Sequence, residues 1–83
     1  MKNVTHVKAE DFSLICELDD GNIYRYDMSF VQKKSGSAID PLKDVNFFKK
    51  VFIELGALAW PNGYEIHGDT VARDGVIISQ AAS

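Results

Sequence analysis

The turn Trp60-Pro61-Asn62-Gly63 constrains the fold of this chain most strongly, because short apolar runs lie on both sides of it. Pro61 presets its own φ, Asn62 tolerates the bridge or left-handed region, and Gly63 adopts a positive φ without a Cβ clash. The stretch therefore predicts a β-hairpin, and the rest of the chain must supply the sheet that this hairpin joins.

Apolar residues alternate at period two in two earlier runs, which is the pattern of half-buried strands. The runs 12–18 and 23–28 are separated by Asp19-Asp20-Gly21-Asn22, whose residues tolerate the left-handed backbone of a tight hairpin. A β-prone segment at residues 4–7 precedes them. In the first run, one face carries Phe12, Leu14, Cys16 and Leu18; in the second, one face carries Tyr24, Tyr26 and Met28, and the other Ile23, Arg25 and Asp27.

The second half of the chain mixes helical and strand signals. Residues 31–41 contain a polar, glycine-containing break and Asp40-Pro41, which predict an exposed connection. A short helical piece is expected at about 42–50, with strands from Val51 and at 57–60 on either side of a turn at Gly56. Residues 69–73 suit one helical turn. The apolar run 76–78 fits a last strand, an interface element or part of a poorly ordered tail.

These elements predict a small α+β fold, with a mostly antiparallel sheet of five or six short strands and one or two short helices. We expect residues 1–83 to form a single domain, because the chain has only 83 residues. A chain of this size buries roughly 60% of the surface that its unfolded form exposes, so its core is thin.

The charge of the chain is distributed unevenly. Its net charge is −3, whereas residues 31–50 contain five lysines and two aspartates and therefore carry +3. This basic window also holds Phe47 and Phe48, a combination that nucleic-acid binders use. The alternative interpretation is that the lysines keep a loop and a helical turn solvated, or that they face an acidic partner protein.

The residue types that catalysis or metal binding requires are scarce. Cys16 is the only cysteine, which excludes an intrachain disulfide, and its apolar neighbours predict a buried thiol. His6 and His67 would have to converge with Asp69 or Glu65 to form a site, and their local spacing does not favour this. No nucleophile motif or phosphate-binding glycine loop is present. We therefore expect neither an enzyme nor a bound cofactor or metal.

The order of these motifs resembles a small bacterial family, the domain of unknown function 2442. The resemblance covers about residues 4–73 and leaves 74–83 as a C-terminal extension; Glu65 stands where the family more often has aspartate. It is carried by Leu14 to Leu18 with Asp20-Gly21, Arg25, Asp27-Met28, Leu42-Lys43-Asp44 before Phe48, Val51-Phe52-Ile53-Glu54, Leu58-Ala59-Trp60-Pro61-Asn62-Gly63 and Asp69-Thr70-Val71.

The resemblance implies a small α+β domain with a mostly antiparallel sheet and implies no known reaction. Such proteins are often encoded beside another small protein, in arrangements like those of toxin–antitoxin pairs. We therefore expect a non-enzymatic protein–protein interaction module, the antitoxin-like or accessory member of a bacterial gene pair, that binds an adjacently encoded protein or forms a homodimer. Because no apolar run reaches the ~20 residues of a membrane span, a cytoplasmic location is expected.

Two other functions stay open from the sequence. One is a regulatory nucleic-acid-associated protein acting through residues 33–50, and the other is a small-ligand-binding domain with a pocket beside Tyr24, Tyr26 and Trp60. Trp60 itself either anchors the hairpin from a half-buried position or offers its ring to a partner. The candidate interaction surface comprises Tyr24, Arg25, Tyr26, Asp27, Lys33, Lys34, Lys49, Lys50, Trp60 and Asn62.

Overall fold

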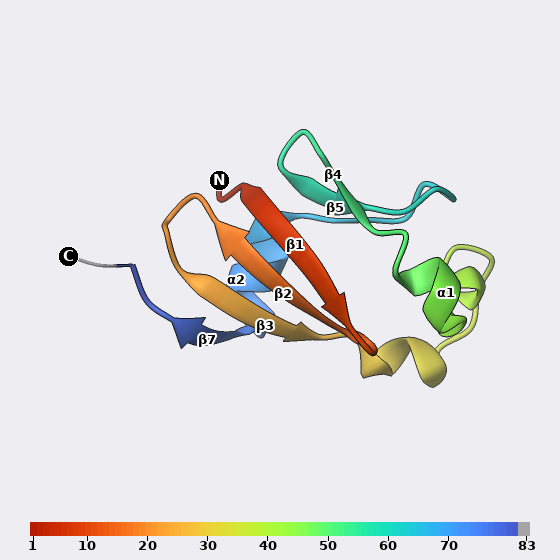
Figure 1. Cartoon of the computed structure of the whole chain (residues 1–83). Helices are drawn as coiled ribbons and strands as arrows, with labels where there is room; N and C mark the ends of the chain where they lie inside the picture. Colours follow the sequence, from red (N-terminus) through yellow and green to blue (C-terminus); the bar gives the residue numbers. More distant parts are fainter. Residues whose placement is uncertain (82–83) are drawn as a thin grey trace.

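Antiparallel strands form two sheets in the computed structural model of the chain, which describes residues 1–81 (Figure 1). The strand order is β1-β2-β3-β7 in the larger sheet and β4-β5-β6 in the smaller one. The strands are β1 (Val4–Glu10), β2 (Ser13–Leu18), β3 (Ile23–Asp27), β4 (Phe52–Glu54), β5 (Ala57–Ala59), β6 (Glu65–Ile66) and β7 (Val76–Ser79). The helical segments are the 3-10 turns η1 (Ser29–Gln32) and η2 (Asp40–Lys43) and the helices α1 (Val45–Phe48) and α2 (Gly68–Asp74).

The predicted α+β fold and antiparallel pairing are confirmed, with more strands than expected. Within residues 1–81 there are seven strands in two sheets, rather than five or six in one. Along the chain, η1, η2 and α1 lie between β3 of the larger sheet and β4 of the smaller sheet. Val31, Leu42 and Phe48 of this segment are fully buried, so the connection that was predicted to be exposed is anchored in the core at Val31.

The β2–β3 hairpin follows the predicted alternation. Leu14, Cys16 and Leu18 of β2 are buried, and Tyr24 and Tyr26 of β3 lie opposite Cys16 and Leu14 on the same face. The turn closes with the Leu18 amide donating to the Asn22 carbonyl at 3.1 Å. Gly21 has a φ of +82°, a conformation that glycine adopts without strain. The local sequence pattern thus decides both the strand faces and the reversal between them.

The helical piece predicted at 42–50 is a 3-10 turn followed by a short α-helix. The side chain of Asp44 accepts a hydrogen bond from the Asn46 amide at 2.9 Å, so Asp44 acts as the N-cap of α1. Pro41 lies in the first turn of η2, where its missing N–H leaves no partner unsatisfied. These short turns bring Leu42 and Phe48 into the core.

One continuous core lies on one face of the larger sheet. Val71 of α2, Leu58 of β5 and Ile66 of β6 are buried in the same cluster as the inward side chains of β2 and β3. Figure 1 shows α2 behind the β1–β3 strands and the β4–β5 hairpin beside β1, with α1 at the far end of the molecule from the C-terminus. The opposite face of the larger sheet carries the alternate side chains, including Arg25 and Asp27.

Residues 76–79 form a strand, so the strand alternative is confirmed for this part of the C-terminal extension. β7 pairs antiparallel with β3, and Arg25 lies opposite Val76. The register shifts between Ile23 and Tyr24, which leaves Ile78 as the extra residue of a β-bulge. Residues 82 and 83, which belong to the predicted extension 74–83, lie outside the described residues.

Candidate functional site

Trp60 is buried, which removes it from the candidate interaction surface. Its side chain is 1% exposed, and its ring packs against those of Phe48 and Tyr64, with centroids 5.8 and 5.7 Å away. The indole Nε1–H donates to the Phe48 backbone carbonyl at 2.9 Å. The ring is therefore more deeply buried than the half-buried anchor predicted from the sequence, and its only polar atom is satisfied inside the protein.

The Trp60-Pro61-Asn62-Gly63 turn has the predicted hairpin geometry. The Trp60 amide donates to the Tyr64 carbonyl at 3.0 Å, and Gly63 has a φ of +91°. Asn62 is exposed and serves the backbone: its Oδ1 accepts from the Tyr64 amide at 3.3 Å and its Nδ2 donates to the Ala38 carbonyl at 2.9 Å. Asn62 thereby ties the turn to the loop before η2.

Tyr24 and Tyr26 also belong to the core rather than to the predicted interaction surface. Both are buried, because β3 turns this face toward the cluster that contains Leu14 and Cys16. The Tyr24 hydroxyl donates to Asp20 Oδ2 at 2.6 Å. The Tyr26 and Phe30 rings form a T-shaped pair with their centroids 6.4 Å apart. Within residues 1–81 no pocket lies beside these rings, so they do not line the cavity that a small ligand would need.

Arg25 and Asp27 are exposed on the same face of β3, as their spacing predicts. Arg25 Nη1 lies 3.5 Å from Glu10 Oε1 across the sheet. Asp27 accepts the Ser29 amide at 2.8 Å, and this hydrogen bond lowers the pKa of its carboxyl group. The two side chains therefore have separate direct partners, and Arg25 adds only a minor electrostatic contribution to the lowered pKa of Asp27.

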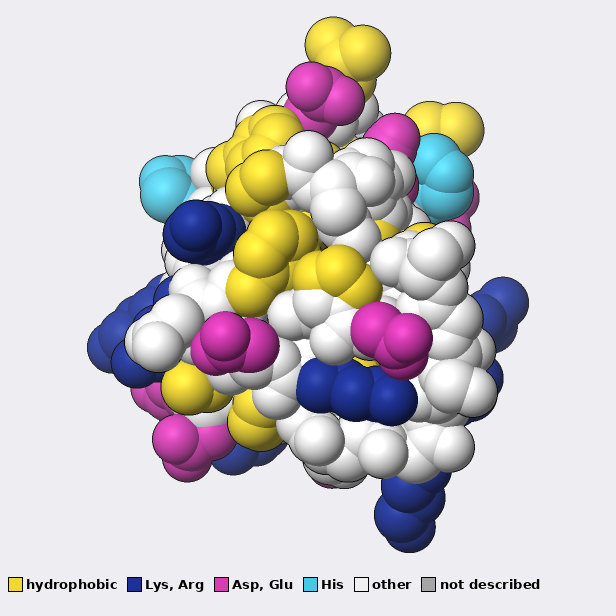
Figure 2. Space-filling view, turned by 90° about the vertical axis from the view of Figure 1, so that its right-hand side faces the viewer, with side chains coloured by type: hydrophobic (Ala, Val, Ile, Leu, Met, Phe, Trp, Pro, Cys, Tyr) yellow, Lys and Arg dark blue, Asp and Glu magenta, His cyan; other side chains and the backbone are white. Residues whose placement is uncertain are grey.

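The basic window lies at the α1 end of the molecule. Lys33, Lys34, Lys49 and Lys50 are exposed, as predicted. The ammonium groups of Lys34 and Lys50 lie over the Phe30 and Phe47 rings, at 5.3 and 5.9 Å from their centroids. Figure 2, which faces this end, shows separate dark-blue groups around the rim and one in the lower centre beside an acidic side chain. The lysines therefore form no continuous basic patch on this face.

The residues that could carry chemistry do not converge. Burial raises the pKa of the Cys16 thiol to about 12, which keeps this thiol protonated and unreactive at neutral pH. The two histidines lie on opposite sides of the face in Figure 2. Among the described residues, no three potential metal-ligating side chains come together. The arrangement of these groups is that of a structural core and a solvated surface.

The sequence interpretation missed two exposed apolar side chains on the hairpin formed by β4 and β5. Leu55 at its tip is 99% exposed, and Phe52 on β4 is 41% exposed. Leu55 and Gly56 have φ values of +50° and +80°, so both central residues of this two-residue turn are left-handed. The turn itself was predicted from Gly56. The signal that could have revealed the exposure is a leucine in the position where such turns prefer asparagine or aspartate.

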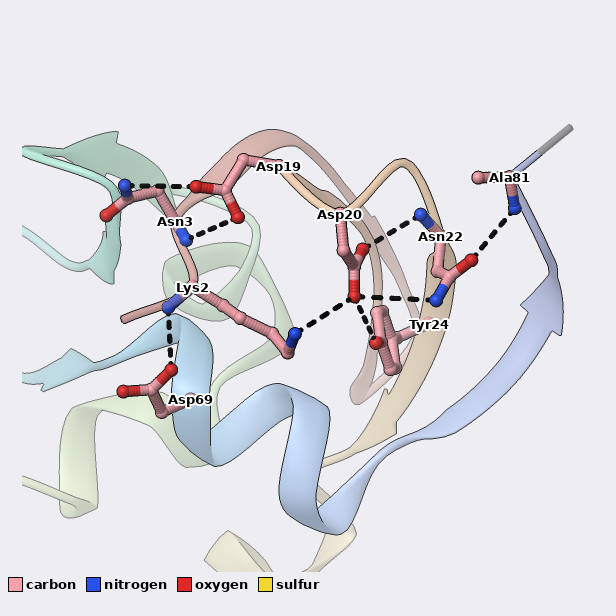
Figure 3. Close-up of polar contacts among 8 residues, drawn as sticks. All are labelled: Lys2, Asn3, Asp19, Asp20, Asn22, Tyr24, Asp69 and Ala81. Atoms are coloured by element: carbon pink, nitrogen blue, oxygen red, sulfur yellow. Dashed lines mark hydrogen bonds and ion pairs between the residues drawn. The ribbon is translucent and has the colours of Figure 1, made fainter. Parts of the chain in front are cut away.

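A polar cluster around Asp20 holds both ends of the described chain against the β2–β3 hairpin (Figure 3). Asp20 accepts hydrogen bonds from the Asn22 amide at 2.9 Å and the Tyr24 hydroxyl, and Lys2 Nζ lies 3.6 Å away. Asn22 Oδ1 in turn accepts from the Ala81 amide at 2.8 Å. The contacts that Asp20 itself makes, of which the hydrogen bond from Tyr24 has the largest effect, lower the pKa of its carboxyl group.

Comparisons of the chain with protein-family models, with curated proteins and with solved structures found no match. Among the described residues, no helix has both the length and the hydropathy that crossing a membrane requires.

Replacing Trp60 tests its role in the core. We expect Trp60→Ala to lower the free energy of unfolding by about 3–5 kcal/mol, because the truncation opens a cavity beside Phe48 and Tyr64. Trp60→Phe keeps an aromatic ring, removes the bond to the Phe48 carbonyl and opens a smaller cavity, so its loss should be smaller. Urea denaturation measures both, and an unchanged midpoint for Trp60→Ala would contradict the burial of the ring.

The Asp20 cluster predicts a dependence of stability on pH. Because folding lowers the pKa of Asp20, its ionised form stabilises the fold above the unfolded value of about 3.9, and this contribution is lost as pH falls through the lower folded pKa. Asp20→Asn should therefore reduce the decline of stability between about pH 6 and pH 2. Urea denaturation across this range measures the decline. Tyr24→Phe removes the hydrogen bond that lowers the folded pKa of Asp20 most, so the decline should be smaller and should end at a higher pH. If the wild-type chain, Asp20→Asn and Tyr24→Phe showed the same dependence of stability on pH, Asp20 would not be the group responsible.

Proposed function

We propose that this chain is a non-enzymatic protein–protein interaction module that binds another small protein through the β4–β5 hairpin. The observation that carries the proposal is Leu55, whose side chain is almost completely exposed while its backbone is left-handed. A left-handed conformation costs a residue with a Cβ roughly 1–2 kcal/mol, and asparagine or glycine bears it better. The monomer thus gains nothing from leucine at this position.

A partner with a small apolar pocket gives that leucine a role. Insertion of the Leu55 side chain would remove it from water, and Phe52 on the same hairpin would add apolar contact area. The hairpin is also held in place: the Val4 amide donates to the Gly56 carbonyl at 2.8 Å, joining its tip to the start of β1. A rigid apolar projection loses little conformational freedom on binding.

The resemblance to the domain of unknown function 2442 supplies the class of partner. In that setting the chain is the antitoxin-like or accessory member of a small bacterial gene pair, it works in the cytoplasm, and its partner is the product of the adjacent gene. A small-ligand-binding role has less support, because Tyr24, Tyr26 and Trp60 fill the core.

Leu55→Asn separates the effect of Leu55 on the stability of the fold from its effect on partner binding. We expect the variant to raise the free energy of unfolding by about 0.5–1 kcal/mol, because asparagine tolerates the left-handed turn. We also expect it to weaken binding to the purified product of the adjacent gene at least about 10-fold, which is about 1.4 kcal/mol. Urea denaturation and isothermal titration calorimetry measure the two effects.

Asn62→Ala provides a matched control at another exposed turn, since it alters neither Leu55 nor Phe52 and should leave the affinity unchanged. If Leu55→Asn bound the gene-pair partner as tightly as the wild-type chain, the hairpin would not be the binding surface. If the wild-type chain failed to bind this partner at all, the proposed partner would be wrong.

A second candidate function, regulatory association with nucleic acid, is favoured by the exposed lysines of residues 33–50, two of which lie over phenylalanine rings. If this function holds, Lys49→Glu combined with Lys50→Glu should abolish binding to duplex DNA at low salt, because phosphate contacts supply most of such affinity. Fluorescence anisotropy with labelled DNA measures it. Absence of wild-type binding at about 20 mM salt would eliminate this function, since screening is weakest there.

A further inference from the structure

The outer edge of β7, at one side of the larger sheet, is a second exposed apolar surface, separate from the β4–β5 hairpin. Among the described residues 1–81, β7 pairs with β3 alone, so the amides and carbonyls that point away from β3 have no strand of this chain beside them. Val76, Ile77 and Ile78 are 66%, 42% and 53% exposed. Residues 75–81 contain no charged side chain and no proline, the residues that usually protect a sheet edge. Only the short length of β7 and the bulge at Ile78 limit further pairing.

This edge is held in its extended conformation by the rest of the fold. Beyond β7, the Ala81 amide donates to Asn22 Oδ1, and Asp20 fixes Asn22 by accepting its amide (Figure 3). The strand is therefore anchored on both sides of its apolar residues, by α2 before it and by the β2–β3 turn after it. An edge that is already ordered loses little conformational entropy when a further strand pairs with it.

We propose that β7 pairs antiparallel with β7 of a second copy of this chain, about a two-fold axis between Ile77 and Ile78. In this register Ile77 lies opposite Ile78 and Val76 opposite Ser79 of the other copy. The two four-stranded sheets then form one sheet of eight strands. The pairing adds a second copy to the partners in the proposed function and uses a different surface from the β4–β5 hairpin.

The distribution of charge favours this arrangement. Arg73 and Asp74 neutralise each other through two bonds of 2.9 Å, and the residues that follow are uncharged through Ala81. Antiparallel pairing sets Asp74, at the end of α2 before β7, near the uncharged C-terminal end of β7 in the other copy. Parallel pairing would place Asp74 beside its own counterpart, and like charges directly opposite one another destabilise a sheet.

The opposite edge of the sheet explains why the assembly closes at two copies. The Val4 amide at the start of β1 is already bonded to Gly56, and the rest of β1 carries the exposed side chains of His6, Lys8 and Glu10. β7 of one copy therefore has no free, apolar β1 edge to join, which prevents a head-to-tail filament. Because the strand is short against a standard interface, we expect a weak dimer with a Kd on the order of 0.1 mM.

Sedimentation velocity from about 10 µM to 1 mM tests the dimer, because this range spans the expected Kd. The weight-average sedimentation coefficient of the wild-type chain should rise with concentration. Val76→Glu should weaken association at least about 10-fold, since it removes an apolar side chain from the interface and buries a carboxylate opposite the uncharged Ser79 of the other copy. Within its own chain the new carboxylate faces Arg25, so urea denaturation should show a retained fold.

A double variant tests the register. Val76→Glu combined with Ser79→Lys sets a carboxylate opposite an ammonium group twice across the two-fold axis, and it should restore association relative to Val76→Glu alone. Leu55→Asn is the matched control on the other surface and should associate like the wild-type chain.

A wild-type chain that stays monomeric to 1 mM would overturn the proposal, as would unchanged association of Val76→Glu. Failure of the double variant to recover would overturn the register. These outcomes are independent of the hairpin, because they use no second protein, whereas loss of partner binding by Leu55→Asn concerns the hairpin alone.

Discussion

The indole N–H of Trp60 donates to the Phe48 carbonyl, and the two aromatic rings pack together. These two contacts join parts of the chain that share no sheet. Phe48 ends α1 in the irregular segment between the sheets, and Trp60 follows β5 in the smaller sheet. A chain of 83 residues has a thin core, so a few large side chains must supply much of the buried apolar area. The rest of the core depends on these two residues meeting.

The polar contacts around Asp20 complement that apolar centre at the other end of the molecule. They connect Lys2 near the N-terminus, the β2–β3 turn and Ala81 beyond β7. Residues far apart in the sequence are thereby held to a single hairpin. Such contacts are individually modest, and their effect is to order the terminal segments, which otherwise fray.

The exposed apolar residues contrast with these buried and hydrogen-bonded side chains. The side chains of Trp60, Phe48 and Tyr24 are buried, whereas those of Leu55 and the β7 residues remain exposed to water although the core is small. A left-handed leucine and an unprotected apolar edge both cost stability or solubility in an isolated chain. Each becomes favourable when another molecule covers it, which is why the proposed contacts centre on these two places. The lysines, by contrast, are solvated around one end of the molecule (Figure 2).

The sequence by itself determined the central strands β2 and β3 of the larger sheet and the main turns. Alternation in residues 12–18 and 23–28 and the glycines at positions 21, 56 and 63 act through local backbone geometry, which needs no knowledge of the rest of the chain. Tertiary structure alone decided which prominent residues face inward. Trp60 and Tyr24 became core residues and Leu55 a surface residue because burial depends on where distant segments meet, and local spacing does not specify that meeting.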